Sequence, residues 1–195
     1  MERDREATEN RLLEAIGSMV AEQGFEKIGI NAVAARAGVS KILIYRYFGS
    51  VEGLMAAYVR RHDFWLTTKV IIPDAGSVGM VVKGLFRSQI EQLRTNVALR
   101  RLYRWELSCT NESIAALRAQ REEAGLSLIR QVSVLSGLPV DKVAFTATLV
   151  TSSITYLVML ADYCPFYNGF SISTDGGWLS FANSIDDLID RMLAG

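Results

Sequence analysis

Apolar residues recur at helical spacing along almost the whole sequence, and no segment alternates long enough to predict a half-buried strand. The first helical stretch covers residues 7–23 and is followed by Gly24, a residue suited to ending a helix. Similar stretches continue to the C-terminus and are interrupted near Pro73 and again near Pro139. The pattern predicts an all-α fold of about nine helices.

Two short helices joined by a tight turn are predicted after the first one. One covers residues 31–37 and stops at Gly38, and the next begins directly after Ser40, whose hydroxyl can cap its free amides. Val39 and Ile44 occupy the two positions of a hydrophobic staple around that cap. This arrangement is the sequence signature of a helix-turn-helix.

A longer helix is predicted to follow, from Ser50 to about Leu66, and the segment from Pro73 to Gly76 is a candidate boundary. Residues 163–177 are rich in glycine, aromatic and hydroxyl side chains and lack a clear period. We expect them to form an ordered loop before a final amphipathic helix.

Residues 143–161 contain no charged side chain and approach the length of a bilayer span. They also contain several threonines and serines, and no cluster of lysine or arginine marks a flank. We therefore interpret this segment as a helix buried on most sides, in a core or a subunit interface, and predict no membrane association.

Composition excludes several classes of protein. The 195 residues carry no net charge, so attraction to nucleic acid must come from a local patch. Cys109 and Cys164 lack the spacing of a zinc or redox site, and the charged start does not resemble a secretory signal. We expect free thiols in a cytoplasmic protein.

Catalytic chemistry finds little support in the sequence. The only histidine, His62, lacks neighbours that would suggest a metal site, and there is no glycine-rich phosphate loop or nucleophile elbow. We predict that the protein is not an enzyme and has no metal or other cofactor.

The predicted helix-turn-helix carries local positive charge. Lys27, Arg36, Lys41 and Arg46 are basic, and no residue from position 27 to position 48 is acidic. Such a patch favours contact with nucleic acid, although a solvated surface charge explains Arg36 and Arg46 equally well.

The helix after the turn has one inward and one outward face. Ile44 and Phe48 lie four residues apart and are expected to face inward. The residues then left facing outward, toward the major groove of DNA, are Lys41, Ile42, Tyr45 and Arg46.

The runs Val-Ala-Ala-Arg-Ala-Gly-Val-Ser-Lys at residues 33–41 and Ile-Tyr-Arg-Tyr-Phe at residues 44–48 resemble the signature of the tetracycline-repressor-like (TetR) family of bacterial transcription regulators. The resemblance covers roughly the first third of the chain, with motif positions spread over several helices. It implies a three-helix DNA-binding domain, here residues 1–50, followed by a helical ligand-binding and dimerisation domain, residues 51–195.

The resemblance also implies which residues contact DNA. Lysine donates to guanine, an isoleucine can meet a thymine methyl group, and tyrosines bind phosphates, although aromatics here could instead pack the small domain. The expected DNA-binding residues are Asn31, Ser40, Lys41, Ile42, Leu43, Tyr45, Arg46 and Tyr47. Gly29, Ile42 and Val51 depart from the family pattern, and Val51, where a lysine is common, is expected to weaken phosphate binding.

The family likeness further implies an inducer pocket among the middle helices and a homodimer formed through the last two helices. A neutral or mostly apolar ligand fits the scarcity of charge there. The candidate ligand-binding residues are Phe86, Ile90, Tyr103, Trp105, Glu106, Phe145, Thr155, Tyr156 and Met159. Core packing is the competing explanation for the aromatics, and pairing with Arg104 or Arg130 is the competing one for Glu106.

The function expected from these features is that of a ligand-responsive repressor that binds a palindromic DNA operator as a homodimer. The helix from Ser50 to Leu66 would couple the ligand pocket to the DNA reader. Two alternatives stay open. The protein could be an activator or a ligand-independent DNA-binding factor, or its C-terminal part could be a small-molecule binding, enzymatic or purely dimerising domain beside a weakened reader.

Overall fold

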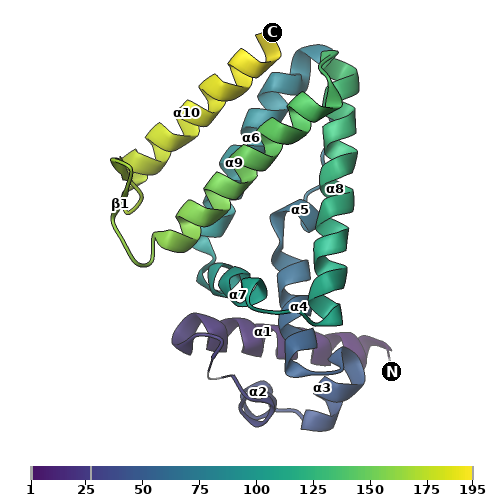
Figure 1. Cartoon of the computed structure of the whole chain (residues 1–195). Helices are drawn as coiled ribbons and strands as arrows, with labels where there is room; N and C mark the ends of the chain where they lie inside the picture. The colour runs from purple at the N-terminus through teal and green to yellow at the C-terminus, as the bar shows by residue number, and fades with distance from the viewer. Residues whose placement is uncertain (1, 27, 195) are drawn as a thin grey trace. The chain divides into compact units, whose positions relative to one another are not determined.

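The computed structural model describes residues 2–26 and 28–194, and within them it is built almost entirely of helices (Figure 1). The all-α prediction is confirmed, with ten α-helices in these ranges where about nine were expected. They are α1 (Glu2–Gln23), α2 (Ile30–Ala37), α3 (Lys41–Phe48), α4 (Val51–His62), α5 (Phe64–Thr67), α6 (Val78–Thr95), α7 (Val97–Leu107), α8 (Glu112–Ser136), α9 (Val140–Leu160) and α10 (Asp175–Ala194). A short 3₁₀ turn, η1 (Ala75–Ser77), precedes α6.

The chain forms two compact units. Unit 1 contains the residues up to Thr67 together with Asn96–Arg121, and unit 2 contains Thr68–Thr95 together with the chain from Glu122 onward. Each unit therefore draws on two separate stretches of sequence, and α8 contributes to both.

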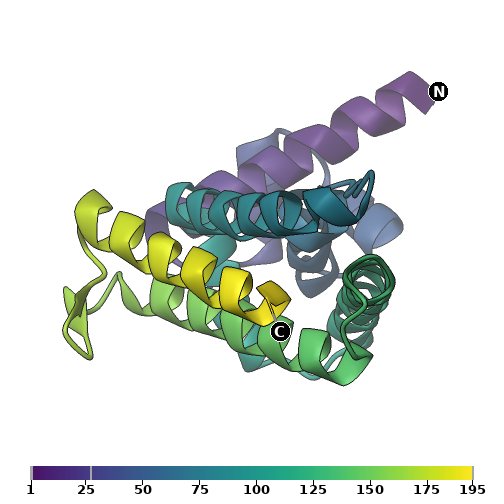
Figure 2. The same cartoon turned by 90° about the horizontal axis from the view of Figure 1, so that it is seen from above.

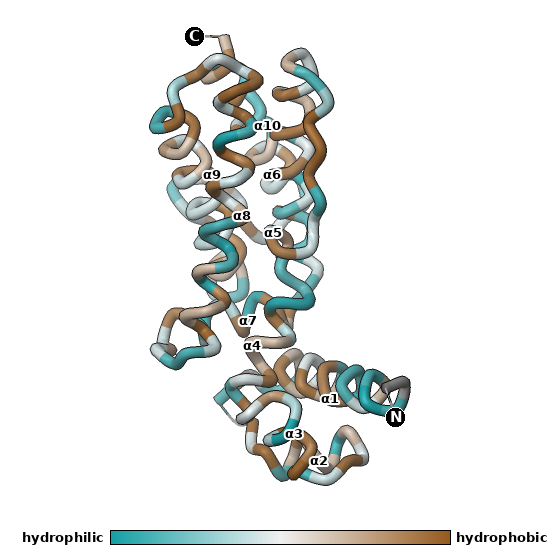
Figure 3. Tube along the Cα trace, turned by 90° about the vertical axis from the view of Figure 1, so that its right-hand side faces the viewer, coloured by the Kyte–Doolittle hydropathy of each residue, from teal (hydrophilic) through white to brown (hydrophobic). Residues whose placement is uncertain are grey.

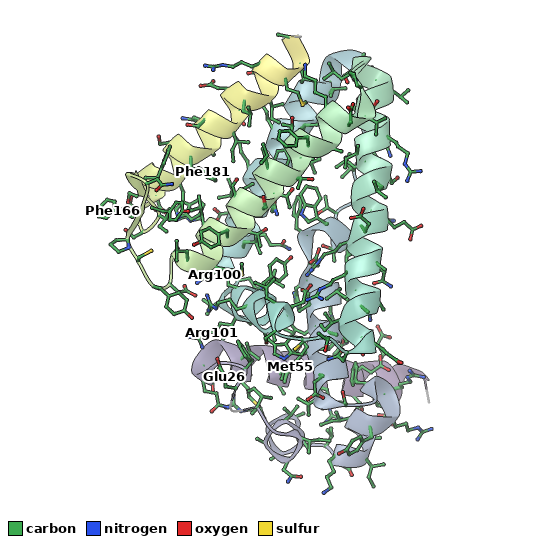
Figure 4. All side chains as sticks on the ribbon, viewed as in Figure 1. Glu26, Met55, Arg100, Arg101, Phe166 and Phe181 are labelled. Carbon is green, nitrogen blue, oxygen red and sulfur yellow. The ribbon has the colours of Figure 1, made fainter. Side chains whose placement is uncertain are left out.

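In unit 1, α1 is the central helix, and α2, α4 and α7 pack against it. Its apolar stripe is fully buried, with Leu12, Ile16 and Val20 all at 0% exposure. From α7, Arg101 donates hydrogen bonds of 2.9 Å to the carbonyl oxygens of Val20 and Ala21, in the last turn of α1 (Figure 4). A cation at this end adds a donor to the carbonyls of the last turn and complements the helix dipole.

The single helix predicted from Ser50 to Leu66 was wrong, because the helix ends at His62 and a second one begins at Phe64. Asp63 between them has extended backbone angles. Its Oδ1 accepts hydrogen bonds from the backbone amides of Trp65, at 3.0 Å, and Leu66, at 3.3 Å. Asp63 therefore caps α5, which is the conformation that aspartate favours at a helix start.

In unit 2, α6 packs against both α9 and α10 (Figure 1 and Figure 2). Valine, leucine and phenylalanine side chains on one face of α6 are buried, and its basic residues reach α10. Lys83 lies 2.7 Å from Asp190, and Arg87 lies 2.6 Å from Asp186. An apolar seam flanked by ion pairs thus joins the two helices.

The uncharged segment forms α9, which among the described residues is the one helix long and apolar enough to cross a membrane. Val143, Val150, Ile154, Leu157 and Val158 on one side of α9 are buried within the protein. Within the single chain α9 is buried on this side only, since Phe145, Leu149 and Tyr156 on another side are exposed, and their burial in a subunit interface remains a prediction.

Between α9 and α10 the structure contains a small hairpin that the sequence analysis missed. Its strands, β1 (Phe166–Tyr167) and β2 (Phe170–Ser171), are antiparallel and pair Tyr167 with Phe170. The turn residues Asn168 and Gly169 have φ angles of 47° and 85°. Asn-Gly is the preferred dipeptide for such a left-handed turn, so the signal was present in the sequence.

Candidate nucleic-acid interface

The predicted turn between α2 and α3 is confirmed. Gly38 closes α2 in the left-handed conformation, with a φ of 64°; its amide donates to the Ala35 carbonyl oxygen at 3.2 Å, and the Val39 amide donates to that of Ala34 at 3.0 Å. The Ser40 hydroxyl accepts a hydrogen bond from the Ile42 amide at 3.4 Å, at the start of α3. The turn is therefore fixed by a glycine on one side and a side-chain cap on the other.

Helix α3 presents a mixed basic and apolar face. Ile44 is completely buried, whereas Ile42 and Tyr45 are 68% and 55% exposed and Lys41 and Arg46 are also exposed. These are the four side chains expected to face outward. The exposed face of α3 therefore combines an apolar side chain, a hydroxyl and two cations, which are the groups that can contact base edges and phosphates.

The other expected DNA-binding residues lie around this face. Asn31 on α2 and the cap residue Ser40 are exposed, while Leu43 and Tyr47 are half-buried. Phe48, expected to face inward, is also half-buried. The structure therefore brings the predicted residues together on α2 and α3, and their contacts with DNA remain a prediction.

The other two basic residues of the predicted positive patch are Lys27 and Arg36. Lys27 lies outside the described residues. Arg36 pairs in a two-pronged manner with Glu22 of α1, at 2.9 and 2.8 Å. The hydrogen bond from Arg36 lowers the pKa of Glu22. This pair connects α1 to α2, so the structural role of Arg36 is evident without DNA.

The departures from the family pattern have visible local effects. Gly29 precedes α2 and provides no side-chain cap, whereas Ser50 caps α4 by accepting from the Gly53 amide at 3.0 Å. Val51 begins α4 and is half-buried. Because valine is apolar, this position provides no positive charge for a DNA phosphate.

Gly53 is a residue that the sequence analysis missed. A Cβ atom built there would lie 2.0 Å from the carbonyl oxygen of Phe48, the last residue of α3. Only glycine therefore permits the close approach between the end of α3 and the first turn of α4. The Ser50 cap and Gly53 together set the angle between these two helices.

Arg5 is a second residue that was missed, because the first helix was expected to begin near residue 7 and it begins at Glu2. The additional residues bring the guanidinium carbon of Arg5 to 5.2 Å from the ring centre of Tyr47 on α3. Arg5 Nε also lies 2.7 Å from a carboxylate oxygen of Glu9. A cation from α1 thus stands beside an expected phosphate-binding tyrosine.

The residues expected to bind ligand are divided between the two units. Tyr103, Trp105 and Glu106 lie on α7 in unit 1 and are buried. In unit 2, Phe86 and Ile90 are buried on α6, Thr155 and Met159 are half-buried on α9, and Phe145 and Tyr156 are exposed. Their role in binding a ligand remains a prediction.

A buried ionic cluster surrounds the α7 residues and ties them to Asp63. Asp63 Oδ2 accepts hydrogen bonds of 2.6 Å from the Tyr103 hydroxyl and from Arg121 Nε. Arg121 Nη1 donates to both carboxylate oxygens of Glu106 at 2.8 Å, and Arg118 lies 3.3 Å from Glu106. Glu106 therefore pairs with two arginines that the sequence analysis did not name.

The electrostatics of this cluster follow from burial. Asp63 is fully buried and Glu106 is 5% exposed. Burial, and next the charge of Asp63, raise the pKa of Tyr103 well above its usual value, so its hydroxyl stays a donor. Two buried carboxylates are thus matched by two guanidinium groups, as charges in a protein interior require.

No group of three or more metal-ligating side chains occurs in the part of the chain that the structure describes. Cys109 and Cys164 are free, half-buried thiols, as expected.

Comparison with known proteins agrees with the helix-turn-helix geometry. Residues 12–58 match the model described as bacterial regulatory proteins, tetR family. The uncharacterized HTH-type transcriptional regulator Rv1255c of Mycobacterium tuberculosis is 30% identical over 126 residues, which cover 60% of this chain and 62% of that protein. The nucleoid occlusion factor SlmA of Haemophilus ducreyi is 28% identical over 115 residues, 58% of this chain and 57% of that one. The chain thus aligns with about three fifths of the length of these relatives.

Solved structures share the fold over nearly the whole chain. The TetR family protein ActR of Streptomyces coelicolor, in complex with (S)-DNPA, superposes with a TM-score of 0.64 at 15% identity, covering 96% of this chain and 97% of ActR. GusR of Salmonella enterica gives a TM-score of 0.64 at 17% identity, covering 96% of each chain. Residues 12–58 thus match the DNA reader of the tetR family of bacterial regulatory proteins, and the chain shares the fold of these TetR family structures over nearly its whole length.

Proposed function

We propose that this protein is a cytoplasmic transcription repressor that binds a palindromic DNA operator as a homodimer and is released by a small, mostly apolar molecule. The observation that carries the DNA-binding part is the exposed face of α3, where Lys41, Ile42, Tyr45 and Arg46 project from a helix fixed by caps on both sides. A helix of this kind fits the major groove of B-form DNA.

The chemistry of this face suits both base reading and phosphate binding. Lys41 can donate to the O6 and N7 acceptors of guanine, and the exposed Ile42 can contact a thymine methyl group. Tyr45 and Tyr47 can donate to phosphate oxygens, and such contacts position the helix without reading sequence. Since the chain has no net charge, this local arrangement must provide the attraction to DNA.

The dimer is supported by an exposed, uncharged face in unit 2. On α9 it consists of Phe145, Leu149 and Tyr156, which are 67%, 49% and 49% exposed. The hydroxyls of Thr148 and Ser152 on the same side donate back to backbone carbonyls of α9, at 2.8 and 2.7 Å. These hydroxyls are therefore already satisfied, which makes the face suitable for burial against a second copy.

Helix α10 contributes a similar surface. Leu179 and Leu188 are 57% and 43% exposed, although Asp187 next to Leu188 is also exposed. Two helices from each of two subunits would form a four-helix contact and bring two copies of α3 to one DNA duplex.

The proposal of a mostly apolar ligand rests on the buried charged groups, which are already paired within the protein. Asp63 and Glu106 are already paired with Arg121, so they are poorly suited to hold a charged ligand. In unit 2 the buried candidates Phe86 and Ile90 are apolar. ActR has been solved in complex with (S)-DNPA and with actinorhodin, which shows that a neighbour of this fold binds small molecules.

The alternatives are distinguished by what happens at a promoter. An activator or a ligand-independent factor would bind the same DNA without blocking transcription or without release by a small molecule. A carrier or enzyme would bind its ligand regardless of DNA. The α3 face would serve a repressor, an activator and a ligand-independent factor equally, so a transcription assay with the bound promoter separates them.

The test is binding to DNA flanking the gene, measured by fluorescence anisotropy across a salt series against a scrambled duplex of equal length. We expect specific binding that weakens with salt and falls roughly 10- to 1,000-fold in the Lys41→Ala/Tyr45→Ala double variant. Lys69→Ala, which removes one exposed cation from the segment between α5 and η1, serves as the charge-matched control and should bind like the wild type. Equal, weak binding to both duplexes would contradict the proposal for this DNA.

A further inference from the structure

The first turns of α1 are strongly hydrophilic (Figure 3), and one of their side chains reaches the DNA reader. The guanidinium of Arg5 lies over the ring of Tyr47, 5.2 Å from its centre, and its Nε lies 2.7 Å from Glu9. The side chains of Arg5 and Glu9 are 62% and 31% exposed. The group is thus assembled at the surface, beside a residue expected to bind phosphate.

The position of Arg5 is unfavourable for the helix that carries it. Helix α1 begins at Glu2, so Arg5 stands in its first turn. There the helix dipole disfavours a cation, because the exposed amide groups already make this end positive. The pair with Glu9 has the weaker of the two i,i+4 orientations, since the acidic residue follows the basic one. Helix stability alone therefore does not account for an arginine here.

An anionic ligand does account for it. The guanidinium of Arg5, which lies against the ring of Tyr47, and the hydroxyl of Tyr47 can both donate to a phosphate oxygen. We propose that Arg5 and Tyr47 together bind a phosphate of the DNA backbone, and that the Glu9 carboxylate takes the place of this phosphate in the free protein. This inference rests on the proposed DNA-binding function and adds a contact from α1 to those of α2 and α3.

The two partners of Arg5 then have opposite roles. Tyr47 orients the planar guanidinium through its ring, and Glu9 holds the guanidinium until DNA replaces it. Removal of Arg5 must weaken DNA binding, and removal of the Glu9 charge must strengthen it. A pair that merely stabilised α1 would give effects of the same sign for both substitutions.

The experiment measures the affinity of the full-length protein for its specific duplex by fluorescence anisotropy between low and physiological salt. Arg5→Ala is expected to reduce affinity about three- to tenfold and to make the slope of log K against log salt shallower by about 0.9, the value for one phosphate contact. Glu9→Gln is expected to raise affinity about two- to fivefold, because the competing ion pair is a surface pair. Glu14→Gln removes the same charge from an exposed position further along α1 and should give a smaller increase than Glu9→Gln.

Three outcomes distinguish this inference from the proposed function. If the wild type binds no specific duplex, the proposed function fails first. If the wild type binds and Arg5→Ala keeps the full salt slope, the phosphate contact is refuted. If Glu9→Gln and Glu14→Gln raise affinity equally, Glu9 does not compete with DNA. Helical circular dichroism of each variant excludes unfolding of α1 as the cause of lost binding.

Discussion

The two units differ in where their ion pairs lie. Unit 1 buries Asp63 and Glu106 and pairs them with arginines from α8. Unit 2 keeps its ion pairs between α6 and α10 near the surface, where the Lys83 and Asp190 side chains are 27% and 57% exposed. Unit 1 presents an outer face with cations on α3, whereas unit 2 presents an uncharged one on α9.

This difference shows how charge can distinguish two exposed faces. Both α3 and α9 expose large apolar side chains, Ile42 on one and Phe145 on the other. The cations beside Ile42 favour a polyanion, while satisfied hydroxyls beside Phe145 favour an apolar surface. The buried cluster around Asp63 lies at the end of α4, the helix that packs against α3 at its other end. It is thus placed to hold α4 in one position.

The largest effect is expected from Asp63→Ala in unit 1. The substitution leaves the Tyr103 hydroxyl and Arg121 Nε without their acceptor and removes the cap of α5, so we expect a loss of about 3–5 kcal/mol in unfolding free energy. Lys83→Ala, which breaks a surface pair in unit 2, should cost much less, because solvent screens that pair. Urea unfolding of both variants gives the comparison. If Asp63→Ala fails to fold, Tyr103→Phe, expected to cost about 1.5–3 kcal/mol, takes its place. Similar small losses for the buried and surface variants would remove the distinction between the units.

The next effect concerns the uncharged face of unit 2. Leu149→Glu would place an unpaired carboxylate in the proposed dimer contact, so we expect the dissociation constant of the dimer to rise about 100-fold or more. Analytical ultracentrifugation at several concentrations measures it. Leu107→Glu changes a leucine that is 73% exposed on α7 in unit 1 and should leave the dimer intact. Equal dissociation by both variants, or a wild type that is a monomer, would rule out this face.

A smaller effect separates the two serine caps of the DNA reader. Ser50 accepts from the Gly53 amide at 3.0 Å, whereas Ser40 accepts from the Ile42 amide at 3.4 Å. We therefore expect Ser50→Ala to cost about 1 kcal/mol of stability and Ser40→Ala less, although Ser40→Ala also affects a residue expected to contact DNA. Thermal unfolding of both variants gives the comparison. A larger cost for Ser40→Ala would show that the α3 cap is the stronger one.

The smallest effect is a pH dependence from the only histidine. Burial, and next the charge of Arg61, lower the pKa of His62 below its usual 6.5. At a pH between the lowered pKa of the folded protein and the usual 6.5 of the unfolded chain, His62 binds a proton in the unfolded chain only. Stability therefore falls as the pH drops below about 6.5. Above that pH both states are neutral and His62 contributes no slope. His62→Gln should flatten unfolding curves measured between pH 7.5 and 5.5. An unchanged slope would assign the dependence to other groups.

Sequence patterns predicted best where a local interaction fixes the backbone. Gly38, Ser40 and Ser50 each act on their immediate neighbours, and the structure has the helix ends where these residues placed them. The break at Asp63 was not predicted, because residues 51–66 keep helical spacing and the aspartate is held by Tyr103 and Arg121 from distant parts of the chain.

In the candidate site too, features fixed by neighbouring residues were predictable and features fixed by distant contacts were not. The outward face of α3 was predictable because one buried residue, Ile44, fixes the orientation of an eight-residue helix. Arg5 was missed because its role depends on contact with Tyr47, more than forty positions away. The membership of a ligand pocket could not be read from helical stripes, because a stripe that lines a cavity and one that packs a core have the same spacing.

The most direct test of the central claim is a footprint of the purified protein on DNA fragments selected from its own genome. The proposed function predicts protection of a palindromic site with two half-sites about one helical turn apart, or a multiple of it, and loss of that protection in Lys41→Ala/Tyr45→Ala. Selected fragments that share no palindrome and give uniform protection would contradict a dimeric, sequence-reading regulator.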